Sequence, residues 1–442
     1  MQGTSSNARD ERSRWEGLLP TERVRFEPGF AWGLASSAFQ SEGGDVPNDW
    51  VDAARAGTVP PNPGNGFYER AESDFALVAS LGVGHYRLSV EWSRVEPEEG
   101  RFDEAALDRY RAICDGARTA GLVPWVNFFH FTHPRWFAAR GGFLAPGGRD
   151  AFLRYLERTG RALAGHARHF HVQNESMAYV VGAYLMGEMP PFVRERDASF
   201  AMTRLVLELQ AGGYGVLKAI DPGATVATIE VYLDVQPRDP DDPGHRLFAE
   251  RFDAWYHGAL LEGLATGWVG LPEQEAVEVP GLRRALDAYG FNYYAPTRLP
   301  LEASGGTRAT GDGRPRPPVD AMGRRVDPAG LERGLLRVAR ALPGVPLLVT
   351  ENGCPTTDET FRIRYVAAHL AALERARRAG APVGGYFHWT AVDNYEWRHG
   401  FGDARFGVIG FDPASLARHV KASGAWLRDV IAAGALDPAS IP

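Results

Sequence analysis

The chain has few cysteines and no long apolar run. Two cysteines in 442 residues, Cys114 and Cys354, do not make a disulfide framework, and we expect both to be reduced thiols. Every apolar stretch is well short of the roughly 18 residues that a membrane span needs. Residues 1–17 also lack the apolar region of a signal peptide. These absences predict a soluble, cytoplasmic protein that does not act at a membrane.

Sequence motifs for metal ions, nucleotides and nucleic acids are missing as well. No Cys/His cluster has the spacing of a structural zinc site, and the twelve histidines include no HExxH, so we expect no metal. No GxGxxG turn follows the first expected strand and no GxxxxGK[ST] loop occurs, which argues against a nucleotide site. The net charge of −7 and the scattered Lys and Arg residues argue against a nucleic-acid partner.

Short apolar runs typical of β-strands alternate with longer helical stretches from residue 30 onwards. The expected strands lie within FAWGLASSAF, GHYRLSV, LVPWVNFF, HFHVQNE, ATVATIEV, YGFNYY, VPLLVTE and GGYFHW. The expected helices cover residues 69–82, 104–120, 147–165, 198–220, 243–266, 328–342 and 361–380. Repeated βα units imply a parallel sheet, and this many imply closure into a (β/α)8 TIM barrel of the α/β class. The alternative is an open, doubly wound sheet, which the missing nucleotide loops disfavour.

The barrel accounts for most of the chain as a single domain over residues 25–435. Residues 1–24 are polar and are expected to form a flexible N-terminal segment, and residues 436–442 a short C-terminal tail. Two further segments, 41–66 and 301–326, are rich in Gly, Pro and Arg and too polar for a core. We expect them to be long loops over the C-terminal face of the barrel.

Two glutamates stand at the ends of expected buried strands, where a carboxylate is poor core material. Glu175 ends HFHVQNE, and Glu351 ends VPLLVTE. Cleavage of a glycosidic bond requires such a pair, because one carboxyl group protonates the departing oxygen while the other attacks or activates water. A separation of roughly 5 Å would indicate retention of configuration, and roughly 6.5 to 9.5 Å inversion. Either glutamate could instead be an ordinary polar residue at a strand-loop junction.

Polar or aromatic residues are expected at the carboxyl ends of nearly all strands, where barrel enzymes have their active sites. They are Gln40, Arg87, His130, Asn174, Asn292, Tyr294, Trp389 and Glu396. A sugar site needs this mixture, because amides, carboxylates and imidazoles bond hydroxyl groups and indoles cover the apolar face of the ring. Single residues keep structural alternatives, such as an ion pair at the bottom of the barrel for Arg87 or a core position for His130.

Six segments in register resemble the family 1 glycoside hydrolases, the β-glucosidase family. They are FAWGLASSAFQSEGG, HYRLSVEWSRVEP, QNES, GFNYYAP, VTENG and HWTAVDNYEW, and the resemblance runs over about residues 26–432. It implies a (β/α)8 barrel and a retaining mechanism with no cofactor. The implied partner is a small-molecule or oligosaccharide β-glycoside, and a homo-oligomer remains open.

The same resemblance implies a role for each candidate residue. Glu351 corresponds to the nucleophile and Glu175 to the acid/base. Arg87 and Tyr294 correspond to contacts of the nucleophile, and Asn292 to a nearby amide of the site. The positions that correspond to sugar contacts are Gln40, His130, Asn174, Trp389, Glu396 and Trp397.

Several positions depart from the family pattern, among them Val172 and Gln173, which replace a common Thr and aromatic before the acid/base. Ser176 stands where Pro usually follows the acid/base, Phe131 replaces a Trp that borders the sugar, and Arg324 replaces a Trp that flanks the leaving group. We expect activity because both carboxyl groups are retained. Arg324 either faces the leaving group, where its fork of donors would favour a polar or anionic group, or turns into solvent.

We therefore predict a retaining β-glycosidase, with β-glucosidase as the preferred assignment, that acts through a covalent glycosyl-enzyme. Two alternatives remain. A transglycosylase would use the same residues, with an acceptor hydroxyl in place of water. A catalytically inactive sugar-binding homologue would usually lack one of the two carboxyl groups, and here both Glu175 and Glu351 are present.

Overall fold

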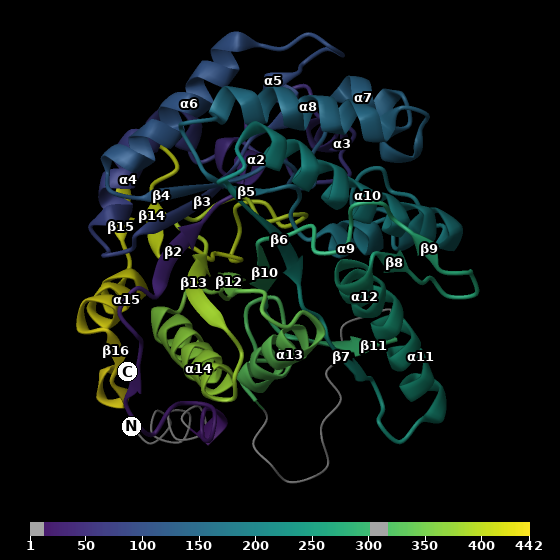
Figure 1. The fold of residues 1–442 in the computed structure, drawn as a ribbon. Coiled ribbons are helices and arrows are strands. Elements are labelled where there is room, and N and C mark those ends of the chain that lie inside the picture. Colours follow the sequence, from purple (N-terminus) through teal and green to yellow (C-terminus); the bar gives the residue numbers. More distant parts are fainter. Residues whose placement is uncertain (1–12, 301–316) are drawn as a thin grey trace.

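Parallel strands form a closed barrel at the centre of the protein (Figure 1). The structure is a computed structural model that describes residues 13–300 and 317–442. The barrel strands are β2 (Ala31–Ala35), β3 (His85–Ser89), β4 (Val123–Asn127), β5 (His169–His171), β6 (Thr225–Val231), β10 (Ala288–Asn292), β12 (Leu347–Asn352) and β13 (Val383–Trp389). Each strand pairs with the next barrel strand along the chain, and β13 pairs with β2 to close the ring. The predicted eight-stranded barrel is confirmed, and the open sheet is excluded.

Helices surround the barrel, as Figure 1 shows. The long ones are α4 (Phe67–Ala79), α6 (Glu104–Thr119), α8 (Gly148–Leu163), α10 (Arg196–Ile220), α11 (Pro243–Asp253), α12 (Ala259–Thr266), α13 (Pro328–Ala341), α14 (Glu359–Arg378) and α15 (Ala422–Ala433). Several begin at a side-chain cap: Asp103 accepts a hydrogen bond from the backbone of Ala106 at the start of α6. The barrel strands and the helices predicted between them occur in the predicted order, with ends that differ by a few residues. The predicted helix 243–266 is divided into α11, η3 and α12, and α15 was not predicted.

Shorter elements complete the fold at both ends of the barrel. The short helices are α2 (Ala38–Glu42), α3 (Asp49–Arg55), α5 (Trp92–Val95), α7 (Arg135–Ala139), η1 (Gly142–Leu144), α9 (Ser176–Tyr179), η2 (Val180–Leu185), η3 (Ala254–Gly258) and η4 (Pro438–Ser440). The two-stranded sheets pair β1 (Val24–Arg25) with β16 (Ala435–Leu436), β7 (Asp234–Pro237) with β11 (Pro296–Leu299), β8 (Trp268–Val269) with β9 (Val277–Glu278), and β14 (Ile409–Phe411) with β15 (Arg418–Val420).

The alternation of side chains along the strands separates an outer core from the barrel interior. In β3, Tyr86 and Leu88 belong to the large apolar cluster that includes the surrounding helices. Successive side chains of a strand point to opposite faces, so Arg87 and Ser89 face the interior of the barrel. The buried side chain of Arg87 therefore points into the barrel interior, toward the residues that follow the carboxyl ends of the strands.

The segment 41–66 differs from its prediction as a long loop without core residues. It contains the helix α3, which begins because the side chain of Asn48 accepts a hydrogen bond from the backbone of Val51. Trp50 on this helix is fully buried, with its ring centroid 4.4 Å from that of Trp397. The prediction was wrong here because the polar composition of the segment masked a short capped helix with one large apolar anchor. Of the other predicted loop, residues 301–316 lie outside the described residues.

The two ends of the chain meet beside the barrel. Residues 1–12 of the expected flexible segment lie outside the described residues. Trp15 is buried, with its ring centroid 5.2 Å from that of Phe361 on α14. Val24 pairs with Leu436, which is fully buried in the stretch that was expected to be a tail. The described parts of both segments therefore pack against the domain, and the expected domain boundaries stay predictions.

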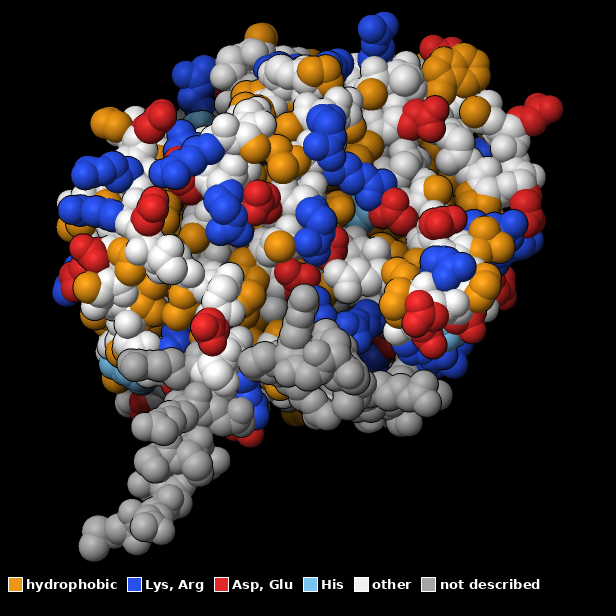
Figure 2. Space-filling model, turned by 90° about the horizontal axis from the view of Figure 1, so that it is seen from below, with side chains coloured by type: hydrophobic (Ala, Val, Ile, Leu, Met, Phe, Trp, Pro, Cys, Tyr) orange, Lys and Arg blue, Asp and Glu red, His pale blue; other side chains and the backbone are white. Residues whose placement is uncertain are grey.

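The surface mixes both signs of charge. On the face in Figure 2, Lys and Arg side chains are interspersed with Asp and Glu. Among the residues that the structure describes, no helix is both long and apolar enough to cross a bilayer. Cys114 and Cys354 are buried free thiols. The cytoplasmic location and the absence of a nucleic-acid partner stay predictions.

Candidate active site

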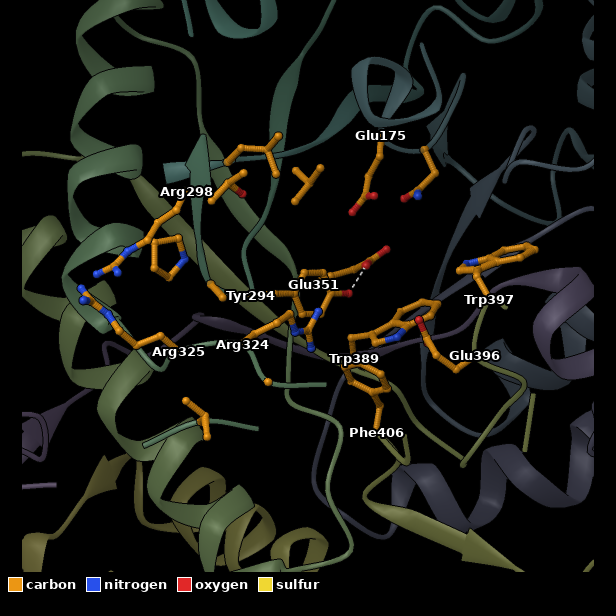
Figure 3. A pocket seen from close by; sticks show the side chains of 18 of the residues that line it. Glu175, Tyr294, Arg298, Arg324, Arg325, Glu351, Trp389, Glu396, Trp397 and Phe406 are labelled. Atoms are coloured by element: carbon orange, nitrogen blue, oxygen red, sulfur yellow. Dashed lines mark hydrogen bonds between the residues drawn. The ribbon is translucent and has the colours of Figure 1, made fainter. Parts of the chain in front are cut away.

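A cavity of about 730 Å³ opens at the carboxyl ends of the barrel strands. This volume lies within the roughly 300–1,000 Å³ of typical small-molecule sites. It is lined by predicted site residues from most of the strands, namely Gln40, His130, Phe131, Asn174, Glu175, Tyr294, Arg324, Glu351, Trp389, Glu396 and Trp397. The other two predicted residues, Arg87 and Asn292, contact this set from just below. Figure 3 shows Glu175 and Glu351 converging on the same space from different strands.

Glu351 reaches the cavity because strand β12 is irregular at its end. Leu347 and Val349 belong to the outer core, so strict alternation would also point residue 351 outwards. The register of β12 shifts against both neighbouring strands near this point, between Val349 and Asn352 on one side and opposite Asn292 on the other. A bulge at a barrel rim re-aims the side chain that it carries, and here it turns Glu351 inwards.

Two donors hold the carboxyl group of Glu351. The guanidinium of Arg87 and the hydroxyl of Tyr294 each donate a hydrogen bond to one of its oxygens. Glu351 is 3% exposed and Arg87 is 1% exposed, so the two opposite charges compensate one another in a site with little solvent. Burial and the charge of Glu351 raise the pKa of Tyr294 well above its usual range, which keeps its hydroxyl protonated as a donor. Glu351 is therefore stabilised as an anion.

Glu175 has the opposite environment. It follows β5 in the left-handed conformation at φ 45°, a sparsely populated geometry that non-glycine residues adopt mostly where the surroundings impose it. Its backbone N–H donates to the carbonyl of Ile229 at 2.7 Å, and its Oε1 accepts from Nδ2 of Asn292 at 2.7 Å. Burial, with a further contribution from the charge of Glu351, raises the pKa of Glu175 well above its usual value. This environment favours the neutral form of Glu175, the form that can donate a proton.

A third carboxylate, Glu230 on β6, supports the turn that carries Glu175, and it was not predicted. It accepts hydrogen bonds from the hydroxyl of Ser176 and from the backbone N–H groups of Ser176 and Met177, the latter two at 3.3 and 3.2 Å. A proline at position 176 has no hydroxyl and no backbone N–H, so it could donate neither of the two bonds that Ser176 donates. Burial raises the pKa of Glu230 to about 7, against the effect of these donors. Its charge also raises the pKa of Glu175.

A hydrogen-bonded row of side chains leads away from Arg87. Its Nη1 donates to Oδ1 of Asn174 at 3.0 Å, and Nδ2 of Asn174 lies 3.4 Å from Nε2 of His130. Burial and the positive charge of Arg87 lower the pKa of His130 well below its usual value, so the imidazole is neutral. Its Nδ1 lies 3.4 Å from the hydroxyl of Ser89, a partner that was not predicted.

Gln40 follows the first barrel strand, β2, and Glu396 follows the last, β13. These two strands are neighbours in the barrel. The amide of Gln40 donates to the carbonyl of Tyr395 at 2.7 Å and accepts from the hydroxyl of Ser37 at 2.8 Å, which fixes its orientation. Burial raises the pKa of Glu396 to about 7, while the nearby positive charge of Arg324 opposes the shift. Amide and carboxyl groups that converge in this way suit a ligand with several hydroxyl groups.

Aromatic rings form one wall of the cavity. Trp389, at the end of β13, is 3% exposed and stacks on His130 with centroids 5.9 Å apart. Trp397 contacts Phe131 edge-on at 5.7 Å. An indole face beside polar side chains can cover the apolar face of a sugar ring while its hydroxyl groups are bonded at the edge.

Arg324 lines the cavity and does not turn wholly into solvent, and its role toward a leaving group stays a prediction. Its side chain is 29% exposed, and its Nε donates to Oδ2 of Asp320 at 2.8 Å. The guanidinium lies over the rings of Tyr294 and Phe406, at 5.2 and 5.6 Å from their centroids. Figure 3 shows it between Glu351 and Trp389 on one side and Arg325 on the other. Phe406, Arg298 and Arg325 line the same cavity and were not predicted.

The signals for the missed residues were weak but present. Glu230 is a charged residue within an otherwise apolar strand run, ATVATIEV, and Arg325 directly follows Arg324. Within residues 13–300 and 317–442, no cluster of three or more His, Cys, Asp and Glu side chains is arranged to hold a metal ion. The chemistry that the described side chains can perform is that of two carboxyl groups, one anionic and one protonated, beside a polar and aromatic pocket.

Comparison with known proteins gives one family. The family model described as "Glycosyl hydrolase family 1" matches residues 22–435. The thermostable beta-glucosidase B of Thermobispora bispora is 30% identical over 92% of this chain and 91% of its own length. A bifunctional beta-D-glucosidase/beta-D-fucosidase of Bifidobacterium breve is 29% identical over 92% of this chain and 98% of its own. Among solved structures, a beta-glycosidase from Pyrococcus horikoshii is 30% identical with a TM-score of 0.84, covering 94% of this chain and 96% of that one.

Glu230→Gln should lower the pKa of Glu175, because it removes a negative charge that favours the protonated form. We expect a fall of up to about one unit, the range that a single neighbouring charge produces in a protected site. The pKa is measured by NMR titration of δ-¹³C-labelled glutamate, with the Glu175 resonance assigned as the one that Glu175→Gln lacks. Glu262→Gln, which removes an exposed carboxylate on α12, is the control. An unchanged pKa, or an equal fall in the control, contradicts the role of Glu230.

Proposed function

The chain belongs to glycosyl hydrolase family 1, and we propose that it is a retaining β-glycosidase that acts preferentially on β-glucosides. One observation carries the proposal: the cavity holds two carboxyl groups in contrasting environments. Glu351 receives hydrogen bonds from Arg87 and Tyr294, which favour its anion. Glu175 has its pKa raised by burial and by Glu351. A double displacement needs this pairing of a nucleophile with an acid.

In the first step, the carboxylate of Glu351 attacks C1 of the sugar and forms a glycosyl ester. The bond between C1 and the glycosidic oxygen breaks, and Glu175 gives its proton to that oxygen. The leaving group then departs as a neutral alcohol or phenol. Protonation by Glu175 lowers the barrier most for poor leaving groups, which are strong bases when they depart.

In the second step, water attacks C1 and releases Glu351 as a carboxylate. Once Glu351 is esterified, its charge no longer raises the pKa of Glu175, so Glu175 can take the proton of the attacking water. Two inversions at C1 give net retention of the β configuration. No cofactor enters either step.

The sugar contacts of the proposal follow from the polar side chains of the cavity. Asn174, which Arg87 orients through a bond of 3.0 Å, is assigned to the 2-hydroxyl, where a hydrogen bond strengthens as the transition state develops. Gln40, His130 and Glu396 are assigned to the other hydroxyl groups, and Trp389 to the ring face. The raised pKa of Glu175, and its fixed position beside Asn292, favour a catalyst over an inactive sugar-binding protein.

A panel of 4-nitrophenyl β-glycosides tests the proposal directly. We expect the highest kcat/KM with the glucoside, and measurable turnover of the fucoside, since the Bifidobacterium relative is named for both sugars. Galactoside and xyloside complete the panel. Absence of turnover on all four sugars contradicts the proposed function, and a preference for another sugar contradicts the glucoside assignment alone. Product analysis with added methanol measures how much of the glycosyl-enzyme passes to an acceptor alcohol.

Glu351→Gly should lose nearly all hydrolysis, because the nucleophile is gone while the pocket remains. The space beside C1 admits azide from the α face, so azide should restore turnover of a dinitrophenyl β-glucoside and give the α-glucosyl azide. NMR of the product identifies the anomer. Turnover by Glu351→Gly without azide would remove Glu351 from this role.

Glu175→Ala should slow alkyl β-glucosides by about 10²–10⁴-fold and dinitrophenyl β-glucosides far less, since a good leaving group needs little protonation. The fall of activity with rising pH should disappear in this variant, because the raised pKa of Glu175 sets that limb in the parent enzyme. When azide is added to Glu175→Ala, it attacks the glycosyl-enzyme formed on Glu351. The product should therefore be the β-glucosyl azide, the opposite anomer from that formed by Glu351→Gly. Equal losses on both substrates with an unchanged pH profile contradict the acid/base role.

A further inference from the structure

Four arginines line the cavity, namely Arg14, Arg298, Arg324 and Arg325. Figure 3 shows Arg298 and Arg325 at the opposite side from Trp397 and Glu396, with Arg324 between them and the catalytic glutamate Glu351. In the proposed function the sugar lies between Glu351, Trp389 and Glu396. The arginines then face the group that leaves.

The side chain of Arg324 lines the cavity and is 29% exposed. Its Nε donates to Asp320, and Asp320 is itself held by the backbone N–H groups of Met322 and Arg324, both at 2.9 Å. The Nη2 atom of Arg324 is buried and has no hydrogen-bond partner in the described part of the chain. Because Nη2 is covered, a ligand in the cavity would reach Arg324 through the exposed part of its side chain, where the positive charge favours an anion.

Arg298 and Arg325 are incompletely neutralised. The side chain of Arg298, on β11, forms no hydrogen bond or ion pair with any other described residue. Among the described residues, the side chain of Arg325 donates a hydrogen bond only to Asp327, at 3.3 Å, and Asp327 also accepts one from Arg333 at 3.2 Å. Desolvation and the nearby positive charge of Arg325 lower the pKa of Arg298. Like charges held this close favour an anion between them.

Apolar side chains line the same cavity as the arginines. Leu233, Pro296 and Val319 are among them, and Val319 is 46% exposed. A leaving group that filled it would bury an apolar body here and place a charged end at the arginines. The combination is typical of an aromatic or aliphatic acid.

We propose that the leaving group of the natural substrate carries an oxyanion, a carboxylate or a sulfate-like group, which Arg298, Arg324 and Arg325 bind at the end of an apolar body. This inference rests on the proposed β-glycosidase activity and names the substrate class of the same site. Guanidinium forks bind planar carboxylates and tetrahedral oxyanions alike through paired N–H donors, so the two sources of charge need separate tests.

Matched glucosides isolate the charge from leaving-group reactivity. We compare 4-(carboxymethyl)phenyl and 4-(sulfomethyl)phenyl β-glucosides with the neutral 4-(carbamoylmethyl)phenyl β-glucoside, where the methylene group keeps the phenols similar in acidity. The parent enzyme should have a kcat/KM at least about tenfold higher for one of the anions, and this ratio should fall as salt screens the exposed arginines. The better anion shows whether the site prefers a planar or a tetrahedral group.

The double variant Arg298→Gln/Arg325→Gln and the single variant Arg324→Gln should each remove most of that preference. The ratio of anionic to neutral substrate cancels any general loss of activity, so a damaged variant remains informative. Arg340→Gln, an exposed position on α13, removes the same unit of charge outside the cavity and should leave the ratio unchanged. An unchanged ratio in the cavity variants, or an equal change in Arg340→Gln, overturns the proposal.

Two further arms keep the failures distinguishable. The first arm measures kcat/KM for 4-nitrophenyl β-glucuronide and for the glucoside. If the ratio of glucuronide to glucoside exceeds the ratio of anionic to neutral leaving group, the arginines bind charge on the sugar and the proposal is wrong. If no glycoside is hydrolysed, the proposed function fails, and calorimetric binding of 4-hydroxyphenylacetate against 4-hydroxyphenylacetamide still tests the arginines. Tighter binding of the acid, lost in Arg298→Gln/Arg325→Gln, supports the site, whereas equal or undetectable binding of both overturns it.

Discussion

The buried ion pair between Arg87 and Glu351 is the contact on which the rest of the site depends. Arg87 is a lumen-facing residue in the middle of β3, and Glu351 would be an isolated buried anion without it. Removing one partner of a buried pair typically costs about 3–5 kcal/mol, because the other charge is left uncompensated. The same guanidinium orients Asn174, and together with burial, the larger cause, it lowers the pKa of His130. One cation in the barrel therefore acts on three neighbours in the site.

The charge of Glu351 also acts on Glu175. Burial is the main cause that raises the pKa of Glu175, and the negative charge of Glu351 in the same cavity raises it further, so both favour the protonated form. The backbone provides the geometry: a bulge turns Glu351 inwards from β12, and a left-handed residue after β5 presents Glu175. Glu230 completes the turn through donors that Ser176 can offer and proline cannot. Ser176, which replaces the usual proline of the family, is thus hydrogen-bonded to Glu230 on the neighbouring strand β6.

The sequence predicted the barrel because the alternation of apolar strand runs with helical stretches is repeated along the chain. An error in the ends of one element does not change the number of strands. Residues such as Gln40, Glu175 and Glu351 could be placed at one face because parallel strands share their carboxyl ends. The bulge in β12 could not be predicted, since VPLLVTEN reads as a regular apolar run. Glu230 was missed because its side chain lies behind the turn that carries Glu175 and not in the cavity. Arg298 and Arg325 depend on how long loops fold over the barrel, and no periodic pattern encodes that arrangement.

The most direct test of the account asks whether Glu351 becomes covalently glycosylated during turnover. Incubation with a 2-deoxy-2-fluoro-β-glucoside of dinitrophenol forms the first ester, and the fluorine slows its hydrolysis by destabilising the cationic transition state. The account predicts a burst of dinitrophenol equal to the enzyme concentration, a mass increase of one fluoroglucosyl group, and its location on Glu351 by peptide mapping. A label on another residue, or steady hydrolysis of ordinary glucosides to α-glucose with no covalent species, would contradict it.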